Sequence, residues 1–246
     1  MYSYYEKNDL YKTNFQYFLE NGLLDNVDYY IVINGTCSLN IPQKPNIKIL
    51  KRENKGFDFG AYSYAIKHID KKYDYYFFLN TSVKGPYVRD KSKPWIHYFL
   101  ELFNKPEVKI VGTSINIYPL SVYGVDLDKI YGNKPPHTHI QSMFFCMNNE
   151  YFEYLKSKKF FNEEELNNTT DINYVIAHKE FGLSQLALTN NWNINSILPK
   201  YRDIDYRTVT QDFNPTSSNG DPYYDGAYFG ETINEYDAIF FKNNRF

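Results

Sequence analysis

Cysteine is scarce in this 246-residue sequence: Cys37 and Cys146 are the only two, and they lack the spacing of a metal-binding or redox pair. We expect both to be reduced thiols inside a cell, since free cysteine is usually buried. Long hydrophobic runs are absent as well, and the longest are of strand length, far too short to span a bilayer. Residues 1–7 lack the basic and then apolar pattern of a secretion signal. These absences predict a cytoplasmic protein without a transmembrane segment.

An excess of charge of either sign is also missing. Lysine and arginine number 27 against 29 acidic residues, and no long basic block occurs, which argues against nucleic acid as a partner. Neither a P-loop nor the glycine fingerprint of Rossmann oxidoreductases is present. Aromatic residues are plentiful, with 26 Tyr and 19 Phe, but they are spread along the whole chain. They therefore indicate core packing and no particular function.

Apolar runs of strand length alternate with segments of helical periodicity, which predicts a single α/β domain over residues 1–246 with an irregular C-terminal third. No internal repeat or linker divides the chain, and the stretch between the fourth and fifth strands is long enough to be a functional loop. The expected strands cover residues 29–34, 47–51, 75–79, 109–113, 141–147 and 193–198, and the expected helices cover 8–24, 59–69, 95–103, 149–157, 171–177 and 180–190.

The most informative stretch runs from the second expected strand through a glycine-rich turn into a helix and the third strand. Gly56 and Gly60 would let the backbone approach a ligand, and Asp58 between them is a hydrogen-bond acceptor. Two strands joined by such a helix make a right-handed crossover in a parallel sheet, whose ligands bind beyond the carboxyl ends of the strands. Alternatively, Gly56 is a plain turn residue and Asp58 is the N-cap of the helix.

Polar residues close the first three expected strands on one side of the predicted sheet. Asn34 and Gly35 follow the first strand, Arg52 follows the second, and Asn80 follows the third. Together with Asp58, they predict that a nucleotide lies over these strand ends.

Five segments of the chain carry a family resemblance: Asn54–Ala61, Phe78–Pro86, His139–Phe145, Glu180–Ser184 and Ile239–Arg245. In the same order, they resemble the rhamnan-synthesis F type of GT-A glycosyltransferase, including related domains in large DNA viruses. The resemblance implies a GT-A-like fold, a mostly parallel sheet flanked by helices, with a nucleotide-binding part at about residues 25–115 and an acceptor and catalytic part at about 116–246. It implies transfer of rhamnose or another hexose from a UDP-, dTDP- or GDP-sugar to a glycan hydroxyl. The alternative is a non-catalytic nucleotide-sugar or glycan-binding domain of the same fold.

By position, Asn80-Thr81-Ser82 corresponds to the Asp-x-Asp triplet with which GT-A enzymes hold Mn²⁺ or Mg²⁺ against the diphosphate. Both acids are missing, so we expect weak or absent metal dependence, and the triplet could simply satisfy the backbone at a strand end. Lys242 and Arg245 would then supply positive charge to the diphosphate, unless they form an ordinary solvated basic end. The donor site expected from these arguments comprises Asn34, Gly35, Arg52, Asn54, Gly56, Asp58, Gly60, Asn80, Thr81, Ser82, Lys242 and Arg245.

The resemblance also implies a catalytic base. In inverting GT-A members an acidic residue opens a leucine-rich helix, and Glu180 fits that pattern. It would take the proton of the acceptor hydroxyl. Alternatively, Glu180 is only a helix-start glutamate favoured by the macrodipole, and Asp171, one helix earlier, is the base.

Acceptor contacts are expected from the segment around the fifth strand. His139, Gln141 and Ser142 are placed there by the resemblance. His137 and His139 would share one strand face, where they could hold a metal or a diphosphate, but two histidines alone do not make a metal site. The ordinary alternative is that His139 is a hydrogen-bonded structural residue.

Overall fold

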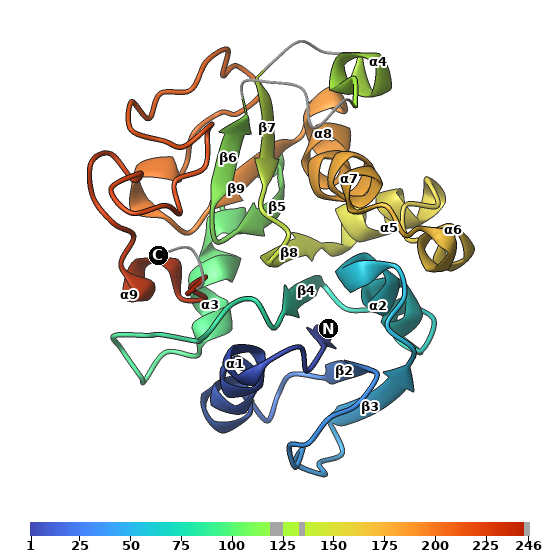
Figure 1. Ribbon diagram of the computed structural model, residues 1–246. Coiled ribbons are helices and arrows are strands. Elements are labelled where there is room, and N and C mark those ends of the chain that lie inside the picture. Colours follow the sequence, from blue (N-terminus) through green and yellow to red (C-terminus); the bar gives the residue numbers. More distant parts are fainter. Residues whose placement is uncertain (119–124, 133–135, 244–246) are drawn as a thin grey trace.

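The computed structural model describes residues 1–118, 125–132 and 136–243. Seven strands form one sheet in the order β3-β2-β1-β4-β8-β5-β9 (Figure 1). β8 is antiparallel to both of its neighbours, and the other neighbouring pairs are parallel. The predicted α/β class, with a mostly parallel sheet flanked by helices, is confirmed. The strands are β1 (Tyr2–Tyr4), β2 (Tyr29–Asn34), β3 (Ile47–Arg52), β4 (Tyr75–Asn80), β5 (Val108–Gly112), β8 (Phe144–Asn148) and β9 (Asn193–Ser196).

The sequence did not predict β1, an interior strand of the sheet. It pairs in parallel with β2 and β4, with Tyr2 opposite both Ile31 and Leu79. The ring of Tyr2 is buried against Phe15 of α1 (Asp9–Asn21). A strand of three residues is too short to show a period, which is why the pattern did not reveal it. The crossover from β3 to β4 therefore passes over two intervening strands, β2 and β1.

Helices cover both faces of the sheet (Figure 1). On one face lie α1 and α3 (Trp95–Leu100), where the rings of Trp95 and Phe144 pack edge to face. On the other face, α2 (Phe57–Ile66) packs on β1 and β2. Further helices that precede β9 in the chain are η1 (Glu101–Phe103), α5 (Asn149–Ser157), α6 (Glu163–Asn168), α7 (Ile172–Val175) and α8 (Gly182–Thr189).

Strand alternation determines where the polar strand ends point. Side chains two residues apart along a strand lie on the same face. On β4, Phe78 packs against Tyr62 of α2, so Asn80 points to the α2 face as well. The same rule places Asn34 of β2 and Ser3 of β1 on that face. Three polar side chains from adjacent strands therefore gather beneath the start of α2.

A separate antiparallel ribbon is formed by β6 (Ile115–Tyr118) and β7 (His137–Ile140). The strand predicted over 141–147 is wrong at its start, since β7 ends before it, a turn follows, and β8 begins only at Phe144. The error arose because the turn between β7 and β8 contains neither glycine nor proline. Between β6 and β7 lies a short helix, α4 (Leu127–Tyr131), and the rest of the loop expected there includes residues outside the described ranges.

The helices predicted over 171–177 and 180–190 form one continuous helical run. α7 and α8 are joined by a π-helical turn, η2 (Ile176–Phe181). Glu180 lies within this turn. The expectation that it opens a helix is therefore wrong, and so is the alternative in which it is only a helix-start glutamate favoured by the macrodipole. π-Helical turns are rare and occur frequently at functional sites.

The described chain after β9 has little regular structure, as the sequence predicted. It contains η3 (Pro199–Tyr201), α9 (Glu235–Ala238) and a few isolated bridges. Both cysteines, Cys37 and Cys146, are unpaired. In the parts of the chain that the structure describes, no helix has the length and apolar character that crossing a bilayer requires.

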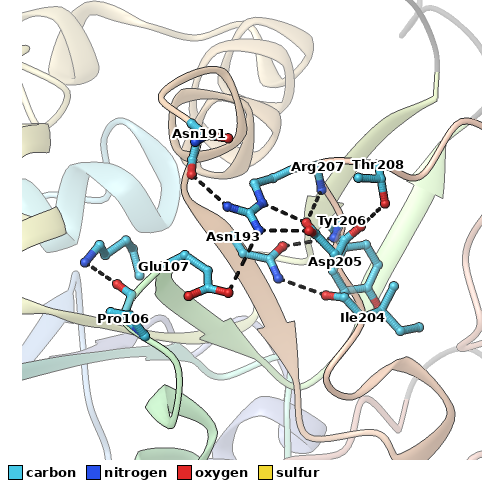
Figure 2. A network of polar contacts seen from close by, with 10 residues as sticks. Pro106, Glu107, Asn191, Asn193, Ile204, Asp205, Tyr206, Arg207 and Thr208 are labelled. Carbon is cyan, nitrogen blue, oxygen red and sulfur yellow. Dashed lines mark hydrogen bonds and ion pairs between the residues drawn. The ribbon is translucent and has the colours of Figure 1, made fainter.

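Figure 2 shows how the segment after η3 is attached to the edge of the sheet. The amide of Asn193 donates to the carbonyl oxygen of Ile204 (2.9 Å) and accepts from the backbone nitrogen of Tyr206 (3.0 Å). Arg207 makes a two-point pair with Asp205, at 2.7 and 2.8 Å. Side-chain amides that replace backbone ladder bonds in this way hold an irregular segment against a strand.

Candidate functional site

A chain of hydrogen bonds joins the carboxyl ends of four neighbouring strands. Arg52 of β3 donates through Nη1 to Oδ1 of Asn34 on β2 (3.3 Å), and Asn34 Nδ2 donates to Oγ of Ser3 on β1 (3.2 Å). Ser3 in turn donates to Oδ1 of Asp58 (3.0 Å). Asn80 of β4 donates to Oδ2 of Asp58 (2.7 Å). Asn34, Arg52, Asp58 and Asn80, which the sequence placed at one edge, are thus brought together.

Asp58 lies at the centre of this chain and faces the sheet. The N-cap of α2 is Gly56, so the alternative in which Asp58 caps the helix is wrong. Burial raises the pKa of the Asp58 carboxyl to about 6, although the hydrogen bonds from Ser3 and Asn80 and the charge of Lys242 act in the opposite direction. The carboxyl is therefore poised between its neutral and charged forms near neutral pH.

The Asn80-Thr81-Ser82 triplet is occupied by its own hydrogen bonds. Oδ1 of Asn80 accepts from both the backbone nitrogen (2.9 Å) and Oγ (2.6 Å) of Ser82, and the carbonyl of Thr81 accepts from Asn14 (2.9 Å). Among the described residues, no group of three or more His, Cys, Asp or Glu side chains is placed to hold a metal ion. Mn²⁺ and Mg²⁺ prefer carboxylate oxygens. The triplet has none, and the two oxygens of the neighbouring Asp58 carboxylate already accept from Ser3 and Asn80, so the side chains at the triplet do not fit such a cation.

Gly56 and Gly60 serve the packing of the protein itself. Gly56 has a φ of +67°, and a Cβ there would lie 2.4 Å from the carbonyl oxygen of Leu166 in α6. A Cβ at Gly60 would lie 2.3 Å from the carbonyl oxygen of Lys55. The space that we expected these glycines to leave for a ligand is filled by the protein's own backbone. The remaining predicted donor residues at this edge are exposed loop positions, Gly35 and Asn54.

Glu180 is held in place by Ser142, in the turn between β7 and β8. The backbone nitrogen of Ser142 donates to Oε2 of Glu180 (3.0 Å), and its hydroxyl donates to the same oxygen. The other oxygen, Oε1, lies 3.8 Å from Nε2 of His139. The Glu180 side chain is still 25% exposed, so it can meet a ligand while Ser142 fixes its direction.

His139 is buried on β7, with its ring 3.8 Å from the ring of Phe181. Its Nδ1 faces the carbonyl oxygen of His137 (3.0 Å), so the neutral ring carries its proton on Nδ1 and directs the lone pair of Nε2 toward Glu180. Burial lowers the pKa of His139, and the Glu180 carboxylate only partly offsets this. His137 bonds instead to Asp128 (2.8 Å), so the two histidines have separate partners.

Lys242 brings a positive charge to both carboxylates. It follows Phe241, whose backbone pairs with Lys84, just beyond the triplet that ends β4. Burial lowers the pKa of Lys242, while Glu180 and Asp58 each act to raise it, which places the ammonium group within electrostatic reach of both. Lys242 is partly buried and is not the solvated basic end that was the alternative.

Three further predicted residues have different surroundings. Gln141 is buried and donates to Oδ2 of Asp221 (3.0 Å). Asp171 is exposed and caps α7 by accepting from the backbone nitrogen of Asn173 (2.9 Å). Arg245 lies outside the described residues.

A polar cavity of about 210 Å³ opens beside Glu180. Its walls come from the β6–β7 ribbon, from η2 and from the irregular segment after β9. A more apolar cavity, of about 250 Å³, lies at the opposite, amino ends of β2 and β4, far along the strands from the polar network. The polar cavity is lined by Asn116, Tyr118, His139, Gln141, Ile176, Glu180, Phe181, Ser218, Asn219, Asp221 and Tyr224.

No protein-family model matches this chain, and no curated protein does either. Among solved structures, it is similar to the galactosyltransferase LgtC in complex with donor and acceptor sugar analogs. The alignment covers 92% of this chain and 90% of that chain, with 11% sequence identity and a TM-score of 0.40. At that level the similarity assigns no role to any residue here.

Sequence reasoning missed several residues of the site. Ser3 completes the network at the strand ends, but it stands in the unpredicted strand β1. Asn14 of α1 holds the triplet, and Asn167 of α6 accepts from Arg52 (2.5 Å). A lone polar residue in a helix or a short strand gives no signal of its own until the fold places it.

Proposed function

We propose that this protein is a glycosyltransferase that moves a sugar from a nucleotide-sugar donor to a hydroxyl of a glycan acceptor. The observation that carries the proposal is the meeting of three elements. A polar network lies at the carboxyl ends of four strands, and Lys242 interacts electrostatically with its central carboxylate, Asp58, and with a second carboxylate, Glu180. Ligands of such sheets bind at that edge.

In this proposal the nucleotide lies over Asn34, Arg52 and Asp58, and Lys242 meets the diphosphate. Glu180 accepts the proton of the acceptor hydroxyl while the acceptor oxygen bonds to the anomeric carbon. The bond between that carbon and the phosphate oxygen breaks, and the nucleoside diphosphate leaves with the electron pair. The ammonium group of Lys242 stabilises the negative charge of the leaving group. No step passes through a metal ion, because the side chains present do not fit one.

The finer assignment rests on the sequence segments alone. Their resemblance to the rhamnan-synthesis F type favours rhamnose or another hexose as the sugar, and a bacterial or viral polysaccharide as the acceptor. We retain a UDP-, dTDP- or GDP-sugar as the donor.

A second candidate is a domain that binds a nucleotide-sugar or glycan without turnover. It is favoured by the contacts of Glu180: a single oxygen of its carboxylate accepts two hydrogen bonds from Ser142, so the protein itself already occupies that oxygen. The absence of both triplet acids points the same way.

Thermal unfolding with UDP-, GDP- and dTDP-sugars tests the binding that both candidates share. A donor present at about 100 times its dissociation constant should add about 2.7 kcal/mol of stability. Release of nucleoside diphosphate in the presence of a saccharide acceptor then separates them. Stabilisation without release supports the binding domain, and no stabilisation by any donor contradicts both.

A further inference from the structure

The cavity beside Glu180 is small and built from buried polar groups. Its volume of about 210 Å³ is below the roughly 300–1,000 Å³ of pockets for drug-sized ligands, so it suits a single ring. Asn116, His139, Gln141 and Asp221, which line it, are each less than 9% exposed. Polar side chains buried to this degree orient a ligand at little cost in side-chain entropy.

One buried polar atom in this wall lacks a partner. Oδ1 of Asn116 has no hydrogen bond to any described residue. An unpartnered buried acceptor is costly, and natural proteins retain few of them. Asn116 shares the cavity with Tyr118 on the same strand and with Tyr224, which is 44% exposed. Hydroxyl groups would satisfy such polar atoms, and an aromatic ring would cover the apolar face of a pyranose.

The charge of the wall has one sign. Glu180 and Asp221 contribute two carboxylates, and none of the described residues that line the cavity is a lysine or an arginine. A ligand that carries a carboxylate would be repelled there. The lining residues also do not include Asn34, Arg52, Asp58 or Asn80, so the cavity is separate from the strand ends over which the nucleotide is proposed to lie.

We propose that this cavity is the subsite for the terminal pyranose ring of the acceptor, and that it accepts uncharged rings and rejects uronic acids. The inference rests on the proposed function, because it takes Glu180 as the group that meets the acceptor hydroxyl. Asp221 supplies the repulsion, and Tyr224 supplies the stacking surface at the exposed side.

Binding of methyl glycosides, followed by ligand-observed NMR without any donor, tests the subsite directly. Methyl galactoside and methyl rhamnoside should bind more tightly than methyl glucuronide. Tyr224→Ala should weaken binding of the neutral glycosides roughly tenfold. Tyr224→Phe should keep the wild-type affinity, because the aromatic ring makes the contact. Tyr236→Ala is the matched control, since Tyr236 is similarly exposed (41%) but lies on α9 and does not line the cavity.

Asp221→Asn tests the charge selection, with thermal unfolding as the check that the variant is folded. This substitution should reduce the difference in binding affinity between methyl glucuronide and the neutral glycosides. A preference for the uronic acid in the wild type, or equal binding by wild type and Tyr224→Ala, would overturn the inference.

Turnover distinguishes an acceptor subsite from a site for the donor sugar. If the inference holds, Tyr224→Ala loses transfer to saccharide but keeps the slow hydrolysis of the donor by water. An equal loss of both would assign the cavity to the donor sugar and overturn it. If no variant and no wild type turns over any donor, the proposed function fails, while the binding series still decides whether the cavity holds a neutral sugar.

Discussion

Two hydrogen-bonding side chains, one cation and burial set the protonation of Asp58. Ser3 and Asn80 donate to its two oxygens, and Lys242 lies within electrostatic reach, yet burial outweighs them and raises the pKa to about 6. A carboxyl in this state can accept a hydrogen bond from a ribose when charged and donate one when neutral.

We expect the stability of the wild type, relative to Asp58→Asn, to fall as pH rises from about 4 to about 6. The folded pKa of about 6 lies above the ordinary value of 3.8, so in this window the folded state keeps a proton that the unfolded state has released. The stability from this group is complete below the ordinary pKa and is lost as pH rises through the folded pKa. Urea unfolding at a series of pH values measures the difference. If the free energies of unfolding of the two proteins changed in parallel with pH, the folded state would not raise the pKa of Asp58.

Glu180→Gln should lower sugar transfer by roughly 100-fold or more, since general base catalysis typically contributes 10²–10⁴. The glutamine oxygen can still accept from Ser142, so the fold and donor affinity should remain. Initial rates of nucleotide release and a donor titration measure both. Asp171→Asn is the matched control, because Asp171 only caps α7 in the described contacts. Loss of transfer in Asp171→Asn, with Glu180→Gln fully active, would move the base to Asp171.

At the scale of elements, the contact between α2 and α6 depends on one glycine. Gly56 combines a φ of +67° with a would-be Cβ 2.4 Å from a backbone oxygen of α6, whereas Gly226 has a φ of +68° and open space around it. Alanine substitutions at the two positions therefore distinguish the cost of backbone strain, which both share, from the cost of a steric clash, which arises only at Gly56.

Gly56→Ala should destabilise the protein by at least about 1 kcal/mol more than Gly226→Ala. Both variants carry the strain of a left-handed alanine, which is about 1–3 kcal/mol, but only the first must also displace α6. Urea unfolding of the two variants and the wild type gives the comparison. Equal losses would mean that α6 moves away at no cost.

The elements were predictable where a periodic pattern persists over several residues. β2, with its run of Tyr29–Asn34, and α5 were located with the correct bounds. β1 was not, because three residues define no period, and the sheet order could not be known without it. The turn at 141–143 was read as strand because it contains no glycine or proline.

The site was predictable only as separate pieces. Asn34, Arg52 and Asn80 could be assigned to one edge because parallel strands end together. The contacts of Glu180 with Ser142 and His139 could not, because the π-helical turn that places Glu180 has no known sequence signal. The packing of β7 against η2 is tertiary structure, which local sequence patterns do not predict.

At the scale of the whole molecule, charge at the site comes from side chains drawn from distant parts of the chain. Asp58, Glu180 and Lys242 belong to α2, η2 and the segment after α9. Together they provide two carboxyl groups and a cation, without a metal-binding cluster among the described residues.

Transfer should therefore persist in EDTA, without stimulation by Mn²⁺ or Mg²⁺. Lys242→Ala should lower it roughly 10–10³-fold, as for the loss of one stabilising group at a leaving oxygen. Lys200→Ala is the control, because Lys200 forms an exposed pair with Glu231. Strong loss in EDTA that Mn²⁺ restores, together with a neutral effect of Lys242→Ala, would contradict the metal-free proposal.

The late position of Lys242 has a consequence for synthesis on the ribosome. Every strand of the sheet is present once β9 has emerged, but Lys242 is held by the pairing of Phe241 with Lys84, two residues far apart in translation order. A nascent chain can therefore complete its sheet, and with it the strand-end network, before the lysine arrives. In terms of the proposed function, such a chain would have the strand-end network but would still lack the lysine that is proposed to meet the diphosphate.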